Sequence, residues 1–121
     1  MTGNFPMLNW QTFSAIYIRP GYTDMRKAIN GLAIIAEEQM KLNIFDSNVF
    51  LFCGRGKRSL KVLYWDSNGF CLWQKRLEKD KYAWPRTETE AQQLTIEDLN
   101  LLLNGLDFTA RHKDLKYLSI S

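Results

Sequence analysis

The side chains best suited to chemistry in this 121-residue chain lie in residues 53–86. Nine lysines and arginines occur there against three carboxylates, an excess of six positive charges in a chain whose formal net charge is +3. Three of the four tryptophans fall in the same segment. Surfaces that hold a nucleic-acid backbone and stack on its bases combine cations with aromatic rings in this way. We therefore predict a nucleic-acid interface whose candidate residues are Arg55, Lys57, Arg58, Lys61, Lys75, Arg76, Trp65 and Trp73.

A structural interpretation of the same side chains stays open. A tryptophan of a small domain is more often packed in the core than stacked on a base, with neighbouring lysines reaching into solvent. The loop at residues 54–59 carries three basic side chains and two glycines. It is either a phosphate-binding loop or a solvated hairpin tip.

Catalytic chemistry is less well supported. The sequence has no phosphate-binding loop of the G-x-x-x-x-G-K-[ST] type, no nucleophile elbow and no zincin motif. Asp24, Asp66 and Glu78 could gather to hold two magnesium ions, as a strand-cutting nuclease requires. Each has a structural explanation, since Asp24 suits a helix cap, Asp66 a turn and Glu78 a charge pair with neighbouring lysines. We therefore predict no catalytic residue, no metal and no cofactor.

Cysteine and histidine are too few for a ready zinc site. Cys53 and Cys71 are the only cysteines and His112 is the only histidine. A tetrahedral zinc site would need a carboxylate and a tail that folds back. A disulfide is disfavoured in a reducing compartment, and both cysteines lie in apolar, strand-like runs. We predict two free thiols that pack as small hydrophobic side chains.

The composition is typical of one globular domain. Hydrophobic residues make up 45% of the chain and charged residues 24%, which is enough apolar side chain for a core. We expect a single domain over residues 1–121, whose ends at 1–12 and 110–121 are candidates for flexibility. No apolar run approaches the roughly 18 residues that cross a bilayer, and the N-terminus lacks a secretory signal. We expect a cytoplasmic protein with no membrane contact.

Hydrophobic periodicity and turn residues divide the chain into strands and helices. Thr23 or Asp24 is the expected N-cap of a long helix, and Thr95 begins the last helix with Asp98 as its capping-box partner. Gly105 is a natural C-cap. The expected strands are 13–19, 48–53, 60–66, 70–77 and a short edge strand at 82–84, and the expected helices are 23–41 and 95–104.

The turn between the third and fourth expected strands decides which side chains share a face. If the loop has three residues, 67–69, Lys61 lies opposite Lys75. Like charges in that position destabilise a hairpin unless an anion such as a phosphate lies between them. A two-residue turn at 68–69 would instead place Lys75 opposite Val62, and the two lysines would not pair.

Several stretches of the sequence resemble one known family. They read PGYTDMRK at residues 20–27, KVLYWDSNGFCLWQKRLE at 61–78, WP at 84–85 and LLNGLD at 102–107. The chain resembles, over roughly residues 16–108, the TnpB-type accessory proteins of the IS66 family of bacterial insertion sequences. These are not the RNA-guided nucleases that share the TnpB label. The resemblance implies a protein encoded beside a transposase that assists transposition, with element-end DNA, the transposase and other element-encoded proteins as partners.

These observations predict an α+β fold, in which an antiparallel β-meander packs against one long helix and a second, short C-terminal helix closes one edge. The leading function is an accessory protein for transposition of an insertion sequence, acting as a non-catalytic DNA-binding or transposase-assisting subunit. One alternative is a protein–protein adaptor that docks on the transposase through an apolar patch without binding nucleic acid. The other is a metal-dependent nuclease subunit.

Overall fold

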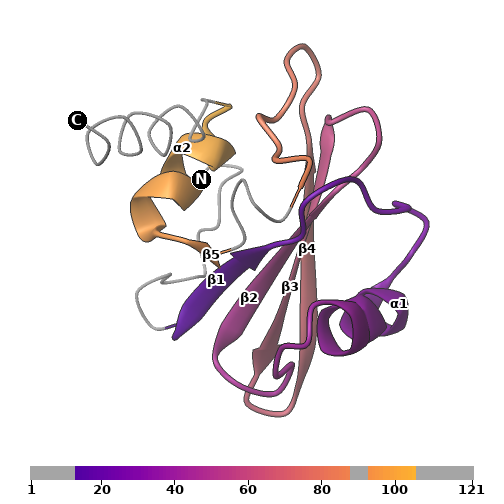
Figure 1. The fold of residues 1–121 in the computed structure, drawn as a ribbon, viewed down its shortest axis with the longest axis vertical. Helices are drawn as coiled ribbons and strands as arrows, with labels where there is room; N and C mark the ends of the chain where they lie inside the picture. The colour runs from indigo at the N-terminus through magenta and orange to yellow at the C-terminus, as the bar shows by residue number, and fades with distance from the viewer. Residues whose placement is uncertain (1–12, 88–92, 106–121) are drawn as a thin grey trace.

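A five-stranded sheet organises the part of the chain that the computed structural model describes, residues 13–87 and 93–105 (Figure 1). The strand order is β4-β3-β2-β1-β5. Strands β1 and β2 are parallel, and every other neighbouring pair is antiparallel. The strands are β1 (Ala15–Ile18), β2 (Asn48–Cys53), β3 (Ser59–Asp66), β4 (Gly69–Arg76) and β5 (Gln93–Leu94). The predicted α+β class and the consecutive antiparallel strands β2, β3 and β4 are confirmed.

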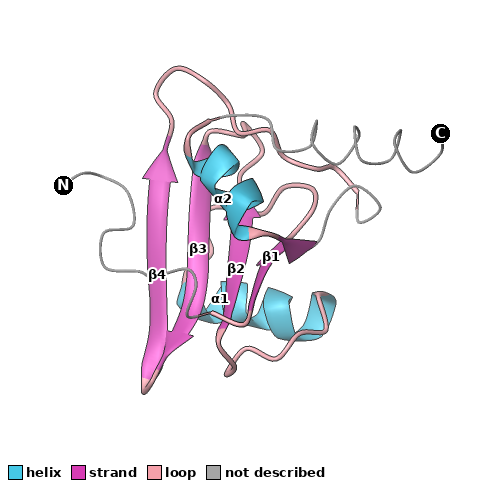
Figure 2. Ribbon diagram, turned by 90° about the vertical axis from the view of Figure 1, so that its left-hand side faces the viewer, coloured by secondary structure: helices cyan, strands magenta, loops and turns pink. Residues whose placement is uncertain are grey.

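Two helical layers cover the two faces of the sheet (Figure 2). Helix α1 (Ile29–Ile34), continued by one π-helical segment, η2 (Ile35–Gln39), packs on the face that carries Phe50 and Phe52. Helix α2 (Ile96–Leu103) packs on the opposite face, against the other side chains of β2. The prediction that the last helix closes an edge was therefore wrong. Because every residue of β2 is buried, both faces of the sheet need a covering layer.

The long helix begins later than the sequence predicts. Thr23 donates its backbone N–H to the carbonyl of Cys53 over 2.7 Å, which ties it to the end of β2. The carboxylate of Asp24 accepts from the backbone N–H of Arg26 over 2.9 Å, and so it caps a turn and not the helix. The helix starts at residue 29, and Ala28 at the N-cap position offers no side-chain cap.

The C-terminal helix has the predicted signals at both ends. The Thr95 hydroxyl accepts from the N–H of Asp98 over 3.1 Å, and the Asp98 carboxylate accepts from the N–H of Thr95 over 3.1 Å. This reciprocal pair is the expected capping box. Gly105 follows the helix with a φ of 74°, in the left-handed region that glycine adopts without cost.

The segment predicted as an edge strand at 82–84 is irregular, and this prediction was wrong. Tyr82 and Trp84 are buried in the core under α2. The Tyr82 N–H bonds to the carbonyl of Lys57 over 2.7 Å, and the Trp84 indole bonds to the carbonyl of Arg19 over 2.8 Å. These bonds run to loops and not to a neighbouring strand. The edge beside β1 is taken by β5, which lies between the expected strand 82–84 and the expected helix 95–104.

The β3–β4 hairpin has a register that differs from both sequence alternatives. Its loop is the pair Ser67 and Asn68, and Gly69 already pairs with Asp66. Ser67 has a φ of 53°, so a serine takes the left-handed position expected of glycine. A shift of one residue turns each side chain of one strand to the other face.

Both cysteines are free, Cys53 buried and Cys71 half-buried, as core packing predicts. None of the helices in the described ranges is long and apolar enough to cross a membrane.

Alkaline pH is expected to destabilise the fold through buried acids. Burial raises the pKa of the Cys53 thiol from 9.0 to about 12 and that of the Tyr82 phenol from 10.0 to about 12. Between pH 9 and 12 the unfolded chain therefore releases protons that the folded chain keeps, and the free energy of unfolding falls as pH rises. We expect Tm to fall from pH 9 to 11, and Cys53→Ala to lessen the slope. A flat profile, or equal slopes in the two proteins, would contradict this.

Candidate nucleic-acid interface

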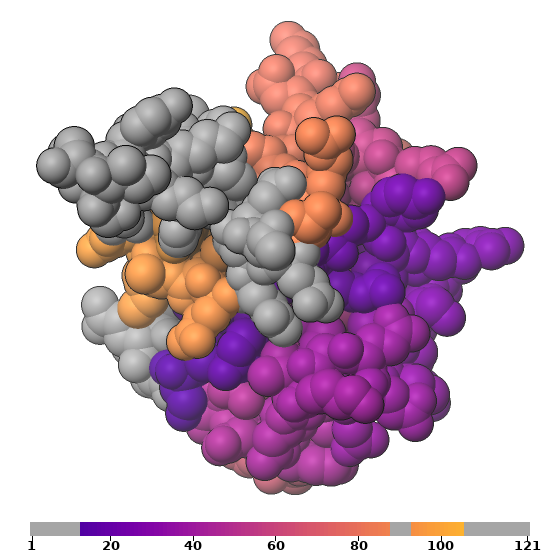
Figure 3. All heavy atoms as spheres, in the orientation of Figure 1, coloured from indigo at the N-terminus to yellow at the C-terminus, as the bar shows by residue number. Residues whose placement is uncertain are grey.

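Three connections that are far apart in the sequence meet at one end of the sheet. Strands β1 and β2 both end there because they are parallel, β3 begins there and β4 ends there. The connections are residues 19–28 after β1, 54–58 between β2 and β3, and 77–87 after β4. We call them together the basic end. In Figure 3 their side chains lie side by side at the top and upper right of the molecule.

Backbone hydrogen bonds join the three connections to one another. These bonds fix the three connections relative to one another, so the side chains of the basic end form one surface. The bonds run from Gly21 N–H to the carbonyl of Pro85 (2.8 Å), Thr23 N–H to that of Cys53 (2.7 Å), Leu77 N–H to that of Arg58 (2.8 Å) and Tyr82 N–H to that of Lys57 (2.7 Å).

The basic end carries nine basic side chains and three acidic ones. Three of the nine, Arg55, Lys57 and Arg58, belong to the predicted site. Three more, Lys79, Lys81 and Arg86, belong to the basic segment 53–86, and the fold adds Arg19, Arg26 and Lys27. Arg26 and Lys27 precede the basic segment by almost 30 residues, so no local charge count could have found them.

Two ion pairs at this end are solvent-exposed. Arg26 lies 2.7 Å from Asp24, and Arg76 lies 3.1 Å from Glu78. The hydrogen bonds from Arg26 hold the pKa of the Asp24 carboxyl well below its usual range. Exposed pairs of this kind contribute little to stability. Their guanidinium groups can therefore exchange a carboxylate for a phosphate at small cost.

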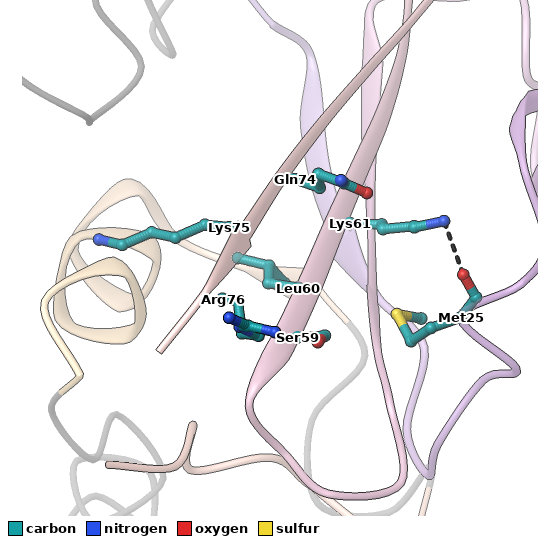
Figure 4. Close-up of a pocket in the computed structure, with 7 residues that line it drawn as sticks. All are labelled: Met25, Ser59, Leu60, Lys61, Gln74, Lys75 and Arg76. Atoms are coloured by element: carbon teal, nitrogen blue, oxygen red, sulfur yellow. Dashed lines mark hydrogen bonds between the residues drawn. The ribbon is translucent and has the colours of Figure 1, made fainter. Parts of the chain in front are cut away.

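The two lysines predicted to face each other leave the sheet in opposite directions (Figure 4). Lys61 pairs with Gln74, and Lys75 pairs with Leu60. The Lys61 ammonium donates to the carbonyls of Met25 and Lys27 over 2.8 Å each, beside α1. The Lys75 ammonium donates to the carbonyl of Leu103 over 3.3 Å, in the last turn of α2. The predicted lysine pair was wrong because the hairpin loop is one residue shorter.

A hollow of about 420 Å³ opens beside these strand ends (Figure 4). It is lined by Met25, Ser59, Leu60, Lys61, Gln74, Lys75 and Arg76.

The two predicted tryptophans lie elsewhere in the fold. Trp65 is next to the β3–β4 loop, at the far end of the sheet from the basic end. Its ring contacts Phe45 and Phe70 at centroid distances of 5.2 and 5.0 Å. Trp73 is half-buried and packs against the core under α2. The eight predicted residues are therefore divided between the basic end, the two faces and the far end.

Each of the three carboxylates considered for a metal site has its own structural role. Asp24 and Glu78 each pair with an arginine, and Asp66 closes the hairpin, its carbonyl accepting from Asn68. Within residues 13–87 and 93–105, no group of three or more histidine, cysteine or acidic side chains is placed to hold a metal ion.

The chain is therefore a small α+β protein in which three connections at one end of the sheet form a single cationic surface. The sequence pattern of the family described as IS66 Orf2 like protein matches residues 14–113. The chain belongs to that family, and it is an accessory protein associated with an insertion sequence.

Two similar proteins come from Sinorhizobium fredii (strain NBRC 101917 / NGR234). "Uncharacterized protein y4hO" is 40% identical over 93 residues, which cover 77% of this chain and 81% of that protein. "Uncharacterized protein y4jC" is 30% identical over 86 residues, which cover 71% and 74%. No solved structure matches the chain.

Proposed function

We propose that this chain is a non-catalytic DNA-binding subunit that assists transposition of its insertion sequence. The observation that carries the proposal is the basic end, where hydrogen-bonded connections present nine cations against three carboxylates. Lysine and arginine side chains that neutralise phosphates release counterions, and this release supplies most sequence-independent DNA affinity. Element-end DNA and the transposase are the partners that an accessory protein of this family would meet.

The proposed footprint is centred on Arg55, Lys57 and Arg58. Lys61 and Arg76 lie at the adjoining strand ends and add positive charge on the α1 face. Lys75 leaves the sheet toward α2, where the helix C-terminus binds its ammonium group. Trp65 and Trp73 are outside the proposed footprint because they lie at the far end of the sheet and against the core.

A second candidate function is a protein–protein adaptor, and one observation favours it. Phe45 is 57% exposed at the far end of the sheet, where it contacts the rings of Trp65 and Phe70. An exposed aromatic cluster is a typical element of a protein-docking surface. The adaptor predicts no salt-dependent affinity for nucleic acid.

A titration of labelled element-end duplex DNA at several salt concentrations tests the two candidates. If about four side chains contact phosphates, log affinity should fall against log salt with a slope near −4. No measurable binding at low salt would favour the adaptor. The same DNA should remain uncut with magnesium, and cleavage that is lost in Glu78→Ala would favour the nuclease subunit.

A matched pair of single variants checks where the DNA binds. Lys41 and Lys57 both have left-handed backbones, with φ values of 62° and 60°, but only Lys57 is at the basic end. Lys57→Gln should weaken duplex binding about eightfold at ~0.1 M salt and reduce the slope by about 0.9. Lys41→Gln removes the same charge from a residue with the same left-handed backbone. It should bind duplex DNA as the parent does. Equal effects of the two variants would contradict a localised footprint.

A further inference from the structure

We propose that a groove within the basic end binds one unpaired nucleotide of a DNA strand, with its base stacked on Tyr22. This inference rests on the proposed DNA-binding function and specifies which form of DNA it takes. The groove has a volume of about 330 Å³ and lies where the three connections meet. Its largely apolar walls include Tyr22, Trp84 and Pro85, and its cations are Arg55, Lys57 and Arg86.

Tyr22 forms an exposed aromatic platform, and the Arg55 guanidinium covers part of its ring. Its side chain is 56% exposed, which is unusual for a large ring with a fixed position. The Arg55 guanidinium donates to the Tyr22 hydroxyl over 2.8 Å, and its carbon atom lies 4.8 Å from the ring centroid. This contact combines a hydrogen bond with a cation–π interaction, so the ring orientation is set before any ligand binds.

The backbone on both sides of Tyr22 is closely packed, which fixes the walls of the groove. Gly21 has a φ of 76°, a conformation that side-chain-bearing residues rarely adopt, and its N–H bonds to the carbonyl of Pro85. A Cβ atom added at Gly54 would lie 2.7 Å from Cγ of Met25. Trp84 is nearly buried, and its indole is bound to the carbonyl of Arg19. These contacts give the groove a rigid wall beside Tyr22.

The chemistry of the groove fits a single unpaired nucleotide better than a duplex. Stacking on Tyr22 requires a base with an open face, and the bases of a duplex already stack on one another. The volume is at the small end of ligand pockets and matches one nucleotide. Arg55 lies at the ring and Lys57 lines the same groove, so both can meet the phosphates that flank a stacked base. An arginine beside an aromatic ring also adds its own plane to the stacking surface.

The test compares a labelled 12-nucleotide oligo-dT strand with a 12-base-pair duplex, by fluorescence anisotropy on the full chain. Tyr22→Ala should weaken binding of the single strand about 5- to 100-fold, the range for loss of one base–aromatic stack. Its affinity for the duplex should fall much less than its affinity for the single strand, and the duplex salt slope should stay near the parental value because no charge is removed. Phe45→Ala is a matched control, since Phe45 is as exposed as Tyr22 but lies at the far end. It should bind both DNAs as the parent does.

Tyr22→Phe separates the stack from the fold. This variant keeps the ring and loses only the hydroxyl that Arg55 binds, so it should retain most of the single-strand affinity. If Tyr22→Ala bound the single strand with the parental affinity, this inference would be overturned. The proposed duplex-binding function would still stand. An equal loss in Phe45→Ala would also overturn the inference. Absence of salt-dependent duplex binding by the parent would instead overturn the proposed function, and this inference with it.

Discussion

Replacing Arg55, Lys57 and Arg58 together by glutamine is expected to weaken duplex DNA binding roughly 100- to 500-fold at ~0.1 M salt. Each lost phosphate contact removes about 0.9 from the slope of log affinity against log salt, so three contacts remove about 2.7. The three side chains lie close together on one loop whose backbone is bonded to the 77–87 connection, so a duplex can meet all three. Fluorescence anisotropy over a range of salt concentrations measures both the affinity and the slope.

A conservative variant separates charge from hydrogen-bond geometry. Arg55 donates to the Tyr22 hydroxyl and Arg58 donates to the carbonyl of Glu78 over 3.1 Å, so glutamine removes local bonds as well as charge. The double variant Arg55→Lys, Arg58→Lys keeps the charges and loses the planar groups. It should keep most of the salt slope if the footprint acts through phosphates. A parental slope in the triple glutamine variant, with folding intact, would remove the footprint and favour the adaptor.

Phe52→Ala is expected to reduce the free energy of unfolding by about 3–5 kcal/mol. Phe52 is 0% exposed in the central strand β2 and belongs to the core under α1, together with Leu32 and Ala36. Truncation removes the buried ring and leaves a cavity that a close-packed core fills only in part. For a chain of this size, Tm should fall by about 10–20 °C. Urea unfolding followed by far-UV circular dichroism gives the free energy directly.

The matched change Phe45→Ala should cost less than about 1.5 kcal/mol. Phe45 makes only edge contacts with other rings and is 57% exposed, so less apolar surface returns to water. Similar losses for the two variants would mean that β2 is not the centre of the core.

Elements with strong local signals could be predicted from the sequence alone. The apolar run of β2 was predicted at its observed bounds, because six successive buried residues between turn signals specify a central strand. The capping box of Thr95 and Asp98 and the glycine at 105 are likewise set by side chains within one turn of the helix. The strands of the hairpin were also predicted, from their β-branched and aromatic residues.

Details that depend on competing local options were predicted less well. Asp24 suits the cap of a helix and the cap of a turn equally, and the bond from Thr23 to Cys53 decides for the turn. The hairpin register depended on whether Gly69 or Ser67 took the left-handed position. The left-handed backbone costs Ser67 a small amount of strain. Burial of the alternate side chains on the two faces of the sheet outweighs this cost.

Three cations of the candidate site, Arg55, Lys57 and Arg58, were determined by the sequence itself because they are neighbours in one loop. Only the tertiary structure decided that Tyr22 and Arg26 lie at the same end of the sheet as these cations. It also decided that Lys61 and Lys75 lie on opposite faces of the sheet. The parallel pairing of β1 with β2 brings the connection after β1 to the same end as the 54–58 loop. Such pairing is stabilised by burial between residues more than 30 positions apart, and neither local propensity nor charge counting reports it.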